Sequence, residues 1–268
     1  MTDDAKGHLI IIGGAEDKSG ESEILKQAPR MMDPDDLLTI ITTATEYPDE
    51  VGRDYREAFS NLGVEHIEVL NIETRDDANS GPICDTIYDS KGIFFTGGDQ
   101  LRITSILGGT KANEELKNLY LEGGFIMGTS AGASAMSSTM IVQGNDNEPA
   151  KKCTLKMAPG LGLIHNCIID QHFDQRGRFG RLLCGIAENP DVLGIGIDED
   201  TAVKVFPDNH FEIIGVNSVT VIDGSSIQSS NVAELRPDEL LAIIGVTVHT
   251  LPAGYGFDMQ TKEVLRLN

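Results

Sequence analysis

A serine flanked by small residues is the feature of this sequence most suited to chemistry. Ser130 lies in the segment Gly-Thr-Ser-Ala-Gly at 128–132, directly after the apolar run at 125–127. Where a strand turns tightly into a helix, small neighbours permit the turn, and the serine hydroxyl projects from the end of the sheet. This pattern predicts a nucleophile elbow, so Ser130 is the candidate nucleophile of a serine hydrolase.

A nucleophilic serine needs a general base, and histidine is the usual one. Of the six histidines, His172 follows a predicted strand at its carboxyl end, among Asp170, Gln171 and Asp174. Ligands of open parallel sheets bind at the carboxyl ends of the strands. A histidine at such an edge is otherwise an ordinary solvated side chain, but the elbow in the same chain makes His172 the candidate base.

Three acids that follow another predicted strand are candidates for the third member of a triad. They are Asp198, Glu199 and Asp200. Alternation along a strand places Glu199 on the opposite face from the other two, but spacing does not decide which carboxylate meets the imidazole. Without a nucleophile this segment is a solvated acidic turn. Because the acids follow the histidine, the chain order differs from that of α/β-hydrolases, which disfavours that fold unless His210 or His249 is the base.

Backbone amides beside the serine are candidates for an oxyanion hole. Gly97 and Gly98 follow the apolar run at 92–96, and the Ala131 amide follows the nucleophile. Amides at 97–99, including those of Gly98 and Asp99, are able to join the Ala131 amide around a developing oxyanion. The alternative is an ordinary glycine-rich turn. The glycine pair at 13–14 lacks the spacing of a dinucleotide fingerprint, so no nucleotide site is predicted there.

Three arginines lie close together in a chain that has few positive charges. Arg178 and Arg181 are one helical turn apart and share a face, and Arg176 precedes them. Guanidinium groups bind carboxylates through two parallel hydrogen bonds. The cluster therefore predicts recognition of an acidic substrate group. Salt bridges to the protein's own acids are an equally good interpretation of these residues alone.

The elements that must position these residues alternate through the first half. Apolar runs predict strands at 8–12, 37–42 and 92–96, and alternation of apolar and polar residues predicts a strand at 66–72. Helical spacing predicts helices at 22–32, 50–62 and 113–121. Such alternation of strands and helices indicates an α/β fold with a mostly parallel central sheet. In the second half we expect a strand at 162–170, a helix at 176–187, and strands at 193–206, 210–214, 218–222 and 241–249. The turn at 207–209 predicts a hairpin, and hence an antiparallel C-terminal extension.

Composition limits the classes of protein and partner. The 268 residues are 40% hydrophobic, which suits a single domain over 1–268. The net charge is −21, from 21 Lys plus Arg against 42 Asp plus Glu, and it excludes nucleic acid as a natural partner. No apolar run is long enough for a membrane span or signal segment, and the acidic residues 1–4 fit neither. The four cysteines lack zinc spacing, so we expect reduced thiols, a cytoplasmic location and no metal.

Five motifs taken together resemble those of a known family. They are I-G-G-A-E-D-K at 12–18, F-T-G-G-D-Q-L-R at 95–102, G-T-S-A-G-A at 128–133, D-Q-H-F at 170–173 and G-I-D-E-D-T at 196–201. With these motifs the chain resembles, over nearly its whole length, the cyanophycinases, which belong to a serine peptidase family that also holds the aspartyl dipeptidases. The resemblance implies a flavodoxin-like sandwich related to class I glutamine amidotransferases, usually dimeric. It also implies cofactor-free release of β-Asp-Arg dipeptides from the end of cyanophycin, a poly-aspartate that bears arginine on each β-carboxyl.

Residue roles follow from the resemblance by position. It implies that Ser130 is the nucleophile, His172 the base and Glu199 the orienting acid. It implies a substrate pocket lined by Gln100, Asp170, Gln171, Arg176, Arg178 and Arg181. The arginines would bind free α-carboxylates, and Asp170 would meet the substrate guanidinium.

Other functions remain open at this point. Aspartyl dipeptidases resemble this chain at the nucleophile but lack the D-Q-H-F and arginine-rich segments. A non-catalytic binding member of the fold, or an amidotransferase with serine in place of cysteine, are further alternatives. The loop at 144–152 matches no pattern of the family and is placed to border the pocket.

Overall fold

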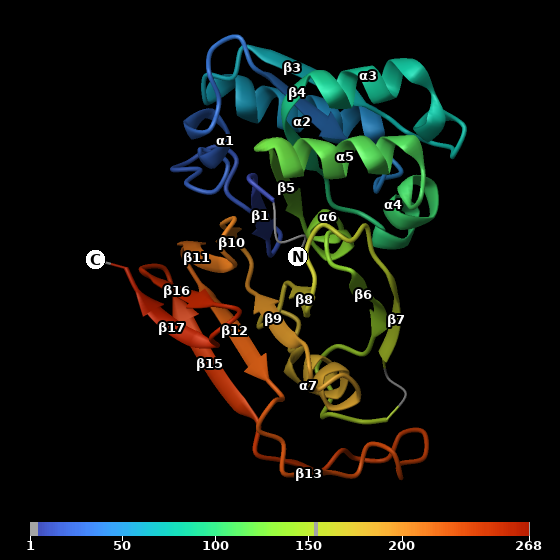
Figure 1. The fold of residues 1–268 in the computed structure, drawn as a ribbon, viewed down its shortest axis with the longest axis vertical. Helices are drawn as coiled ribbons and strands as arrows, with labels where there is room; N and C mark the ends of the chain where they lie inside the picture. Colours follow the sequence, from blue (N-terminus) through green and yellow to red (C-terminus); the bar gives the residue numbers. More distant parts are fainter. Residues whose placement is uncertain (1–4, 153–154, 268) are drawn as a thin grey trace.

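The computed structural model describes residues 5–152 and 155–267. Within these residues the chain forms a nine-stranded sheet, a four-stranded sheet and two short paired-strand hairpins (Figure 1). The predictions for residues 1–4 and for Cys153 lie outside the described part of the chain. In Figure 1 the N-terminal half and its helices occupy the upper part, and the C-terminal half occupies the lower part.

The large sheet runs through the N-terminal half and continues into C-terminal strands. In spatial order its strands are β17 (Glu263–Arg266), β16 (Tyr255–Asp258), β11 (His210–Gly215), β10 (Thr201–Val205), β1 (His8–Ile12), β5 (Phe125–Thr129), β4 (Ser90–Phe95), β2 (Leu37–Ile41) and β3 (His66–Leu70). Strands β1 to β5 pair in parallel, whereas the remaining strands pair antiparallel. The predicted α/β class, with antiparallel C-terminal strands, is confirmed. The order β3-β2-β4-β5 matches the 2-1-3-4 order of flavodoxin-like sheets, and β1 takes the fifth place.

The smaller sheet lies in the C-terminal half. Its order is β15 (Thr247–Pro252), β12 (Ser218–Asp223), β9 (Leu193–Ile197) and β8 (Cys167–Gln171). Only β8 and β9 pair in parallel among its described strands. The hairpins are β6 (Thr139–Gly144) with β7 (Leu155–Pro159), and β13 (Ser229–Ser230) with β14 (Ile243–Ile244). The sequence did not predict β6 and β7, although β6 directly follows the nucleophile segment.

Helices cover the sheets, and two of them, α4 (Gln100–Leu107) and α5 (Lys111–Glu122), begin at a side-chain cap. The others among the described residues are α1 (Gln27–Arg30), α2 (Pro48–Asn61), the 3-10 turn η1 (Asp77–Asn79), α3 (Gly81–Asp89), α6 (Ala131–Ala135) and α7 (Phe179–Glu188). Helix α5 begins where the Thr110 side chain accepts a hydrogen bond from the Asn113 amide, and it ends at Gly123, whose φ is 104°. A hydroxyl cap and a left-handed glycine are common signals for these two ends.

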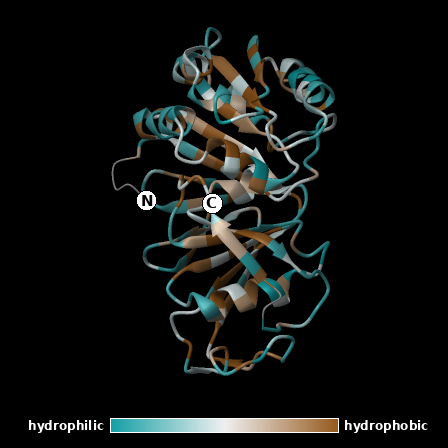
Figure 2. Ribbon diagram, turned by 90° about the vertical axis from the view of Figure 1, so that its right-hand side faces the viewer, coloured by the Kyte–Doolittle hydropathy of each residue, from teal (hydrophilic) through white to brown (hydrophobic). Residues whose placement is uncertain are grey.

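Alternation along the central strands divides the core between the two faces of the large sheet. Ile10 and Ile12 of β1 belong to the cluster that Tyr55 and Phe59 of α2 also join. The intervening residues of β1 belong to a second cluster, which contains residues of α4 and α5 and residues of the smaller sheet. Figure 2 shows the hydrophobic strands inside and the hydrophilic helix faces outside. One continuous core thus joins the two sheets; a single domain over 1–268 stays a prediction.

The helix predicted at 22–32 is mostly wrong. The structure has a helix only at Gln27–Arg30, preceded by turns. Pro29 has no amide to donate, and Ser22 has a φ of 49°, so a continuous helix cannot form here. The apolar spacing nevertheless identified buried residues, because Ile24 and Leu25 are 2% and 0% exposed.

The strand predicted at 193–206 is two strands in different sheets. The chain leaves β9 after Ile197 and enters β10 at Thr201, and Asp200 between them has a φ of 48°. Residues 162–166 are likewise not strand, and only Cys167–Gln171 forms β8. The segment at 241–249 contains the end of the β13–β14 hairpin and the start of β15. The hairpin predicted at 207–209 is confirmed by the antiparallel β10–β11 pair.

The carboxyl ends of strands from both sheets meet at one place. β8 belongs to the smaller sheet, so its carboxyl end does not lie on the edge of the large sheet where β1, β4 and β5 end. The two sheets are instead joined by backbone hydrogen bonds: the His172 amide donates to Gly13 O (2.8 Å) and the Asp200 amide donates to Gly14 O (2.9 Å). The segments that carry the predicted catalytic residues therefore converge through contacts between sheets.

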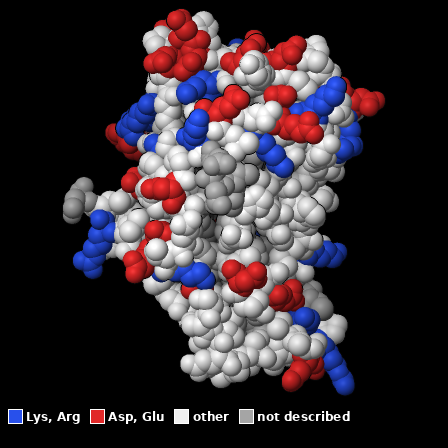
Figure 3. All heavy atoms as spheres, viewed as in Figure 1, with Lys and Arg blue, Asp and Glu red and all other residues white. Residues whose placement is uncertain are grey.

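The surface carries many charges of both signs. On the face shown in Figure 3, acidic side chains are spread over the upper part with lysines and arginines among them.

Among the described residues, none of the helices has both the length and the apolar character needed to cross a lipid bilayer.

Candidate active site

The serine lies on a strained turn between β5 and α6. All residues of β5 are buried, and Ser130 has φ 51° and ψ −109°, a conformation that is rare for residues other than glycine. A β-carbon at Gly132 would lie 2.6 Å from the carbonyl oxygen of Phe95, so the turn excludes larger side chains. This is the geometry expected of a nucleophile elbow.

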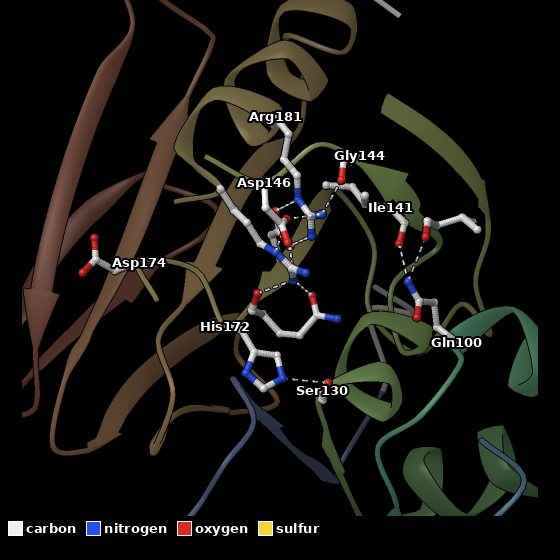
Figure 4. A network of polar contacts seen from close by, with 12 residues as sticks. Gln100, Ser130, Ile141, Gly144, Asp146, His172, Asp174 and Arg181 are labelled. Carbon is white, nitrogen blue, oxygen red and sulfur yellow. Dashed lines mark hydrogen bonds and ion pairs between the residues drawn. The ribbon is translucent and has the colours of Figure 1, made fainter. Parts of the chain in front are cut away.

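The structure brings three of the predicted residues into one chain of hydrogen bonds. Ser130 Oγ lies 3.0 Å from His172 Nε2 (Figure 4), and His172 Nδ1 lies 2.6 Å from Glu199 Oε1. An ionised carboxylate only accepts hydrogen bonds, so Nδ1 carries the proton and donates to Glu199. Nε2 is then the acceptor of the serine proton. This is the arrangement of a nucleophile, a base and an orienting acid.

The two aspartates beside Glu199 have other partners. Asp198 accepts hydrogen bonds from the Asp174 amide (3.0 Å) and from the amide and hydroxyl of Ser218 (3.1 and 2.8 Å). Asp200 accepts from the amide of Asp17 at 2.9 Å. These bonds tie the acidic turn to its surroundings. The structure therefore places Glu199, and neither aspartate, at the imidazole.

The environment of His172 favours its neutral form. Burial lowers the pKa of His172 below its ordinary value, and the positive charges of Arg176 and Arg178 lower it further. The hydrogen bond that His172 donates to Glu199 raises the pKa of His172 but does not offset the effect of burial. A neutral imidazole can accept the serine proton, so His172 is ready to act as a base at neutral pH.

Removing the exposed charge of Arg176 should move the acid limb of the pH profile. Reaction at Ser130 needs neutral His172, so its rate falls as the pH drops through the pKa of His172. Arg176→Ala removes a charge that opposes protonation, so this pKa rises and the limb moves to higher pH. Arg176→Lys keeps the charge and should leave the limb near its wild-type position.

The rate of Ser130 labelling by a fluorophosphonate, measured against pH, reports this limb without requiring a bound peptide. Salt should reduce the difference between the two variants, because exposed charges are screened. An equal shift in the Ala and Lys variants would contradict the electrostatic explanation.

Of the three predicted oxyanion-hole amides, two are free to donate among the described residues and one is already bonded. Among the described residues the amides of Gly98 and Ala131 have no hydrogen-bond acceptor, and neighbouring Gly97 lies against Ser130. The Asp99 amide donates to Ala44 O at 2.9 Å, while its carboxylate caps α4. The prediction for Asp99 is therefore wrong, because its amide is already bonded. Gly97 and Gly98 remain candidates beside Ala131.

The arginine cluster is largely paired within the protein. The Asp170 side chain is 0% exposed and accepts from Arg181 Nε at 2.6 Å, from Arg181 Nη2, and from Arg178 Nη1 at 3.4 Å. Asp146 accepts from Arg178 Nε and Arg181 Nη1 at 2.9 and 3.2 Å (Figure 4). A direct contact between Asp170 and a substrate guanidinium is thus contradicted, because both of its oxygens are buried and bonded.

The remaining predicted pocket residues differ in how far they are available. Arg176 is exposed, and its guanidinium has no hydrogen bond or ion pair with the described residues. Gln100 donates through Nε2 to the carbonyl oxygens of Ile141 (2.9 Å) and Val142 (3.4 Å), which leaves its own carbonyl oxygen open. Gln171 is buried, and its Oε1 accepts from Arg178 Nη1 at 3.2 Å. Arg176 is therefore the predicted cation best placed to meet a ligand.

Two residues that support the site are not indicated by any pattern in the sequence. Asp146, in the loop at 144–152, joins the guanidinium pair although no motif points to it. Gln175 accepts a hydrogen bond from the Glu199 amide at 3.0 Å through its Oε1. Both are hydrogen-bonded across loops that are distant in sequence, so no local spacing indicates them. Among the described side chains, His, Cys, Asp and Glu nowhere gather in a group of three that could hold a metal ion.

Comparison with known proteins gives consistent matches. The sequence profile of peptidase family S51 matches residues 9–214. A cyanophycinase of Synechococcus elongatus is 35% identical over 261 residues, which cover 97% of this chain and 81% of that protein. A cyanophycinase of Trichormus variabilis is 36% identical over 262 residues, with 97% and 88% covered. A solved peptidase from an acI-B1 actinobacterium has a TM-score of 0.67 at 21% identity, covering 96% of this chain and 98% of that one, and supports the fold.

Proposed function

The chain belongs to peptidase family S51, and from this membership we propose that it is a cyanophycinase-type exopeptidase that releases β-Asp-Arg dipeptides from arginine-bearing poly-aspartate. The hydrogen-bonded series Ser130, His172 and Glu199 is the observation on which the catalytic part of the proposal depends. The substrate part depends on the relatives, which are cyanophycinases matched over almost all of this chain.

Acyl transfer accounts for the proposed reaction. Ser130 Oγ attacks the scissile carbonyl carbon while its proton passes to His172 Nε2. Glu199 stabilises the imidazolium through Nδ1, and the Ala131 amide with a glycine amide at 97–98 binds the oxyanion. The imidazolium then protonates the leaving amine as the carbon–nitrogen bond breaks. Water, deprotonated by the same histidine, attacks the acyl-enzyme, releases the carboxylic acid and returns the proton to Ser130.

Charge near the nucleophile supports a substrate that carries carboxylates. The unpaired guanidinium of Arg176 is exposed, and the backbone of this residue is bonded to the loop that bears Asp146. Arg178 and Arg181 are ion-paired with Asp146 and Asp170, so this cluster is neutralised within the protein and leaves Arg176 as the available cation. We propose that Arg176 meets a substrate carboxylate.

The preferred substrate is tested by offering the polymer and small peptides side by side. The protein is incubated with insoluble cyanophycin and, separately, with α-linked aspartyl dipeptides, and the products are identified by mass spectrometry. We expect β-Asp-Arg from the polymer and little cleavage of the α-linked peptides. The matched control is Ser130→Ala, which should release no dipeptide above background. Faster cleavage of the α-linked peptides would contradict the proposal and support an aspartyl dipeptidase.

A further inference from the structure

The turn at 12–17, which follows β1, contributes no reacting group to the proposed mechanism. It nevertheless contacts every segment that supplies a member of the triad. We infer, on the basis of the serine peptidase mechanism proposed above, that this turn positions the triad. Gly14 packs against the His172 imidazole and fixes its place, and Glu16 holds the nucleophile turn through a hydrogen bond. Both are positioning residues, because neither touches the reacting atoms of a substrate.

Backbone hydrogen bonds provide the first support. Three successive carbonyl oxygens, those of residues 12–14, accept from the amides of Ser130, His172 and Asp200 at 3.1, 2.8 and 2.9 Å. Each bond therefore joins the turn to a different segment of the site. The turn at 12–17 is therefore hydrogen-bonded to the segments of the nucleophile, the base and the acidic turn, which follow different strands, and it fixes their relative positions.

The contact between Gly14 and the imidazole provides the second line of support for this inference. Gly14 has a φ of 101°, and a β-carbon built on it would lie 2.3 Å from His172 Cε1 and 2.5 Å from Nε2. The space for a side chain at Gly14 is thus filled by the catalytic ring. Any larger residue must push the imidazole away or move the turn. A misplacement of about 1 Å in an active site costs roughly 10²-fold in rate.

The buried carboxylate of Glu16 provides the third line of support for this inference. Glu16 is 5% exposed; its Oε1 accepts from the Tyr55 hydroxyl and its Oε2 from the Thr129 hydroxyl, both at 2.5 Å. No ion pair to Glu16 is present among the described residues. A buried carboxylate is stable only when its oxygens are hydrogen-bonded, so these hydroxyls are held firmly. Thr129 directly precedes strained Ser130, and its fixed side chain helps to hold the elbow in shape.

The role of Gly14 in positioning the imidazole is tested by comparing Gly14→Ala with the control variant Gly63→Ala. Gly63 has a φ of 93°, and a β-carbon there would meet nothing within 4 Å. Both variants place alanine at a similar positive φ, but only the first displaces His172. Relative to wild type, Gly14→Ala should label with a fluorophosphonate roughly 10²-fold more slowly. Gly63→Ala should label at the wild-type rate.

Wild-type labelling of Gly14→Ala would overturn the role assigned to Gly14. A wild-type protein that does not label at all would instead contradict the serine peptidase mechanism, so the two failures are distinguishable. KM for cyanophycin should change little in Gly14→Ala, because the substrate-binding side chains are untouched.

The anchor at Glu16 is tested by two variants that each remove one of its hydroxyl partners. Thr129→Val and Tyr55→Phe keep the shape of the side chain and should lower the melting temperature to similar extents. Only Thr129→Val should slow the labelling of Ser130, and Thr129→Ser, which restores the hydroxyl, should recover the rate. Wild-type labelling rates in both variants would show that Glu16 has a structural role alone. If Gly14→Ala fails to fold, this pair still tests whether the turn at 12–17 positions the nucleophile.

Discussion

Replacing Ser130 by alanine should lower dipeptide release by on the order of 10⁴-fold or more, because the nucleophile and the acyl-enzyme are both lost. Ser130 Oγ is the hydroxyl that lies 3.0 Å from His172 Nε2, so no neighbouring group replaces it. The measurement is the initial rate of β-Asp-Arg release from cyanophycin. Binding of the polymer should persist, since alanine adds no bulk at the bottom of the site.

The strained backbone at Ser130 gives this variant a second readout. Alanine tolerates a φ of 51° no better than serine, so the strain remains and stability should be close to wild type. Near-wild-type release by a correctly folded Ser130→Ala protein would contradict the assignment of the nucleophile. Loss of release together with loss of folding would point to the turn itself, and Ser130→Cys then serves as the second test, since it retains a nucleophile.

Replacing Glu199 by glutamine should lower turnover by about 10³- to 10⁴-fold, by analogy with the loss of the orienting carboxylate in serine proteases. The amide has no charge to stabilise the imidazolium, and its NH₂ group can donate to Nδ1 and impose the wrong tautomer. The 2.6 Å bond between Glu199 Oε1 and His172 Nδ1 is the interaction that is changed. The rate of acyl-enzyme formation in a single turnover measures the effect directly.

Asp198→Asn is the matched control for Glu199→Gln. It also converts a carboxylate to an amide, one residue away, but Asp198 binds the Asp174 amide and Ser218 instead of the imidazole. We expect Asp198→Asn to lower the melting temperature more than it lowers turnover, and Glu199→Gln to do the reverse. Greater catalytic damage from Asp198→Asn would mean that the wrong acid had been assigned.

The central strands show why local patterns predict part of this fold well. Apolar runs identified β1, β2 and β4 to within two residues, because a buried parallel strand is a continuous apolar segment. Alternation identified the edge strand β3, which is only partly buried. The helix at 22–32 was wrong, since apolar spacing reports burial and not the missing amide of Pro29. The break between β9 and β10 was also missed, because both strands are apolar and the turn at 198–200 is short.

The arginine cluster shows how far the sequence predicts the partners of side chains. The sequence placed Arg178 and Arg181 on one face of a helix, but two interpretations stayed open. Tertiary structure decided between them by burying Asp170 between the guanidinium groups and by bringing Asp146 from the loop at 144–152. A charge cluster in a sequence does not reveal whether its partner is the protein or a ligand, since that depends on what lies opposite it.

The sequence by itself determined the nucleophile, because the elbow around Ser130 is a property of five consecutive residues and the small side chains that its turn requires. It also indicated His172, which ends a strand. Spacing left the third member open among residues 198–200, and the family resemblance implied Glu199. The tertiary structure places Glu199 at the imidazole, because a left-handed turn at Asp200 sets the direction of these side chains. It likewise showed that the Asp99 amide is already bonded and that the turn at 12–17 supports all three segments. These contacts join residues far apart in the chain, so local spacing contains no information about them.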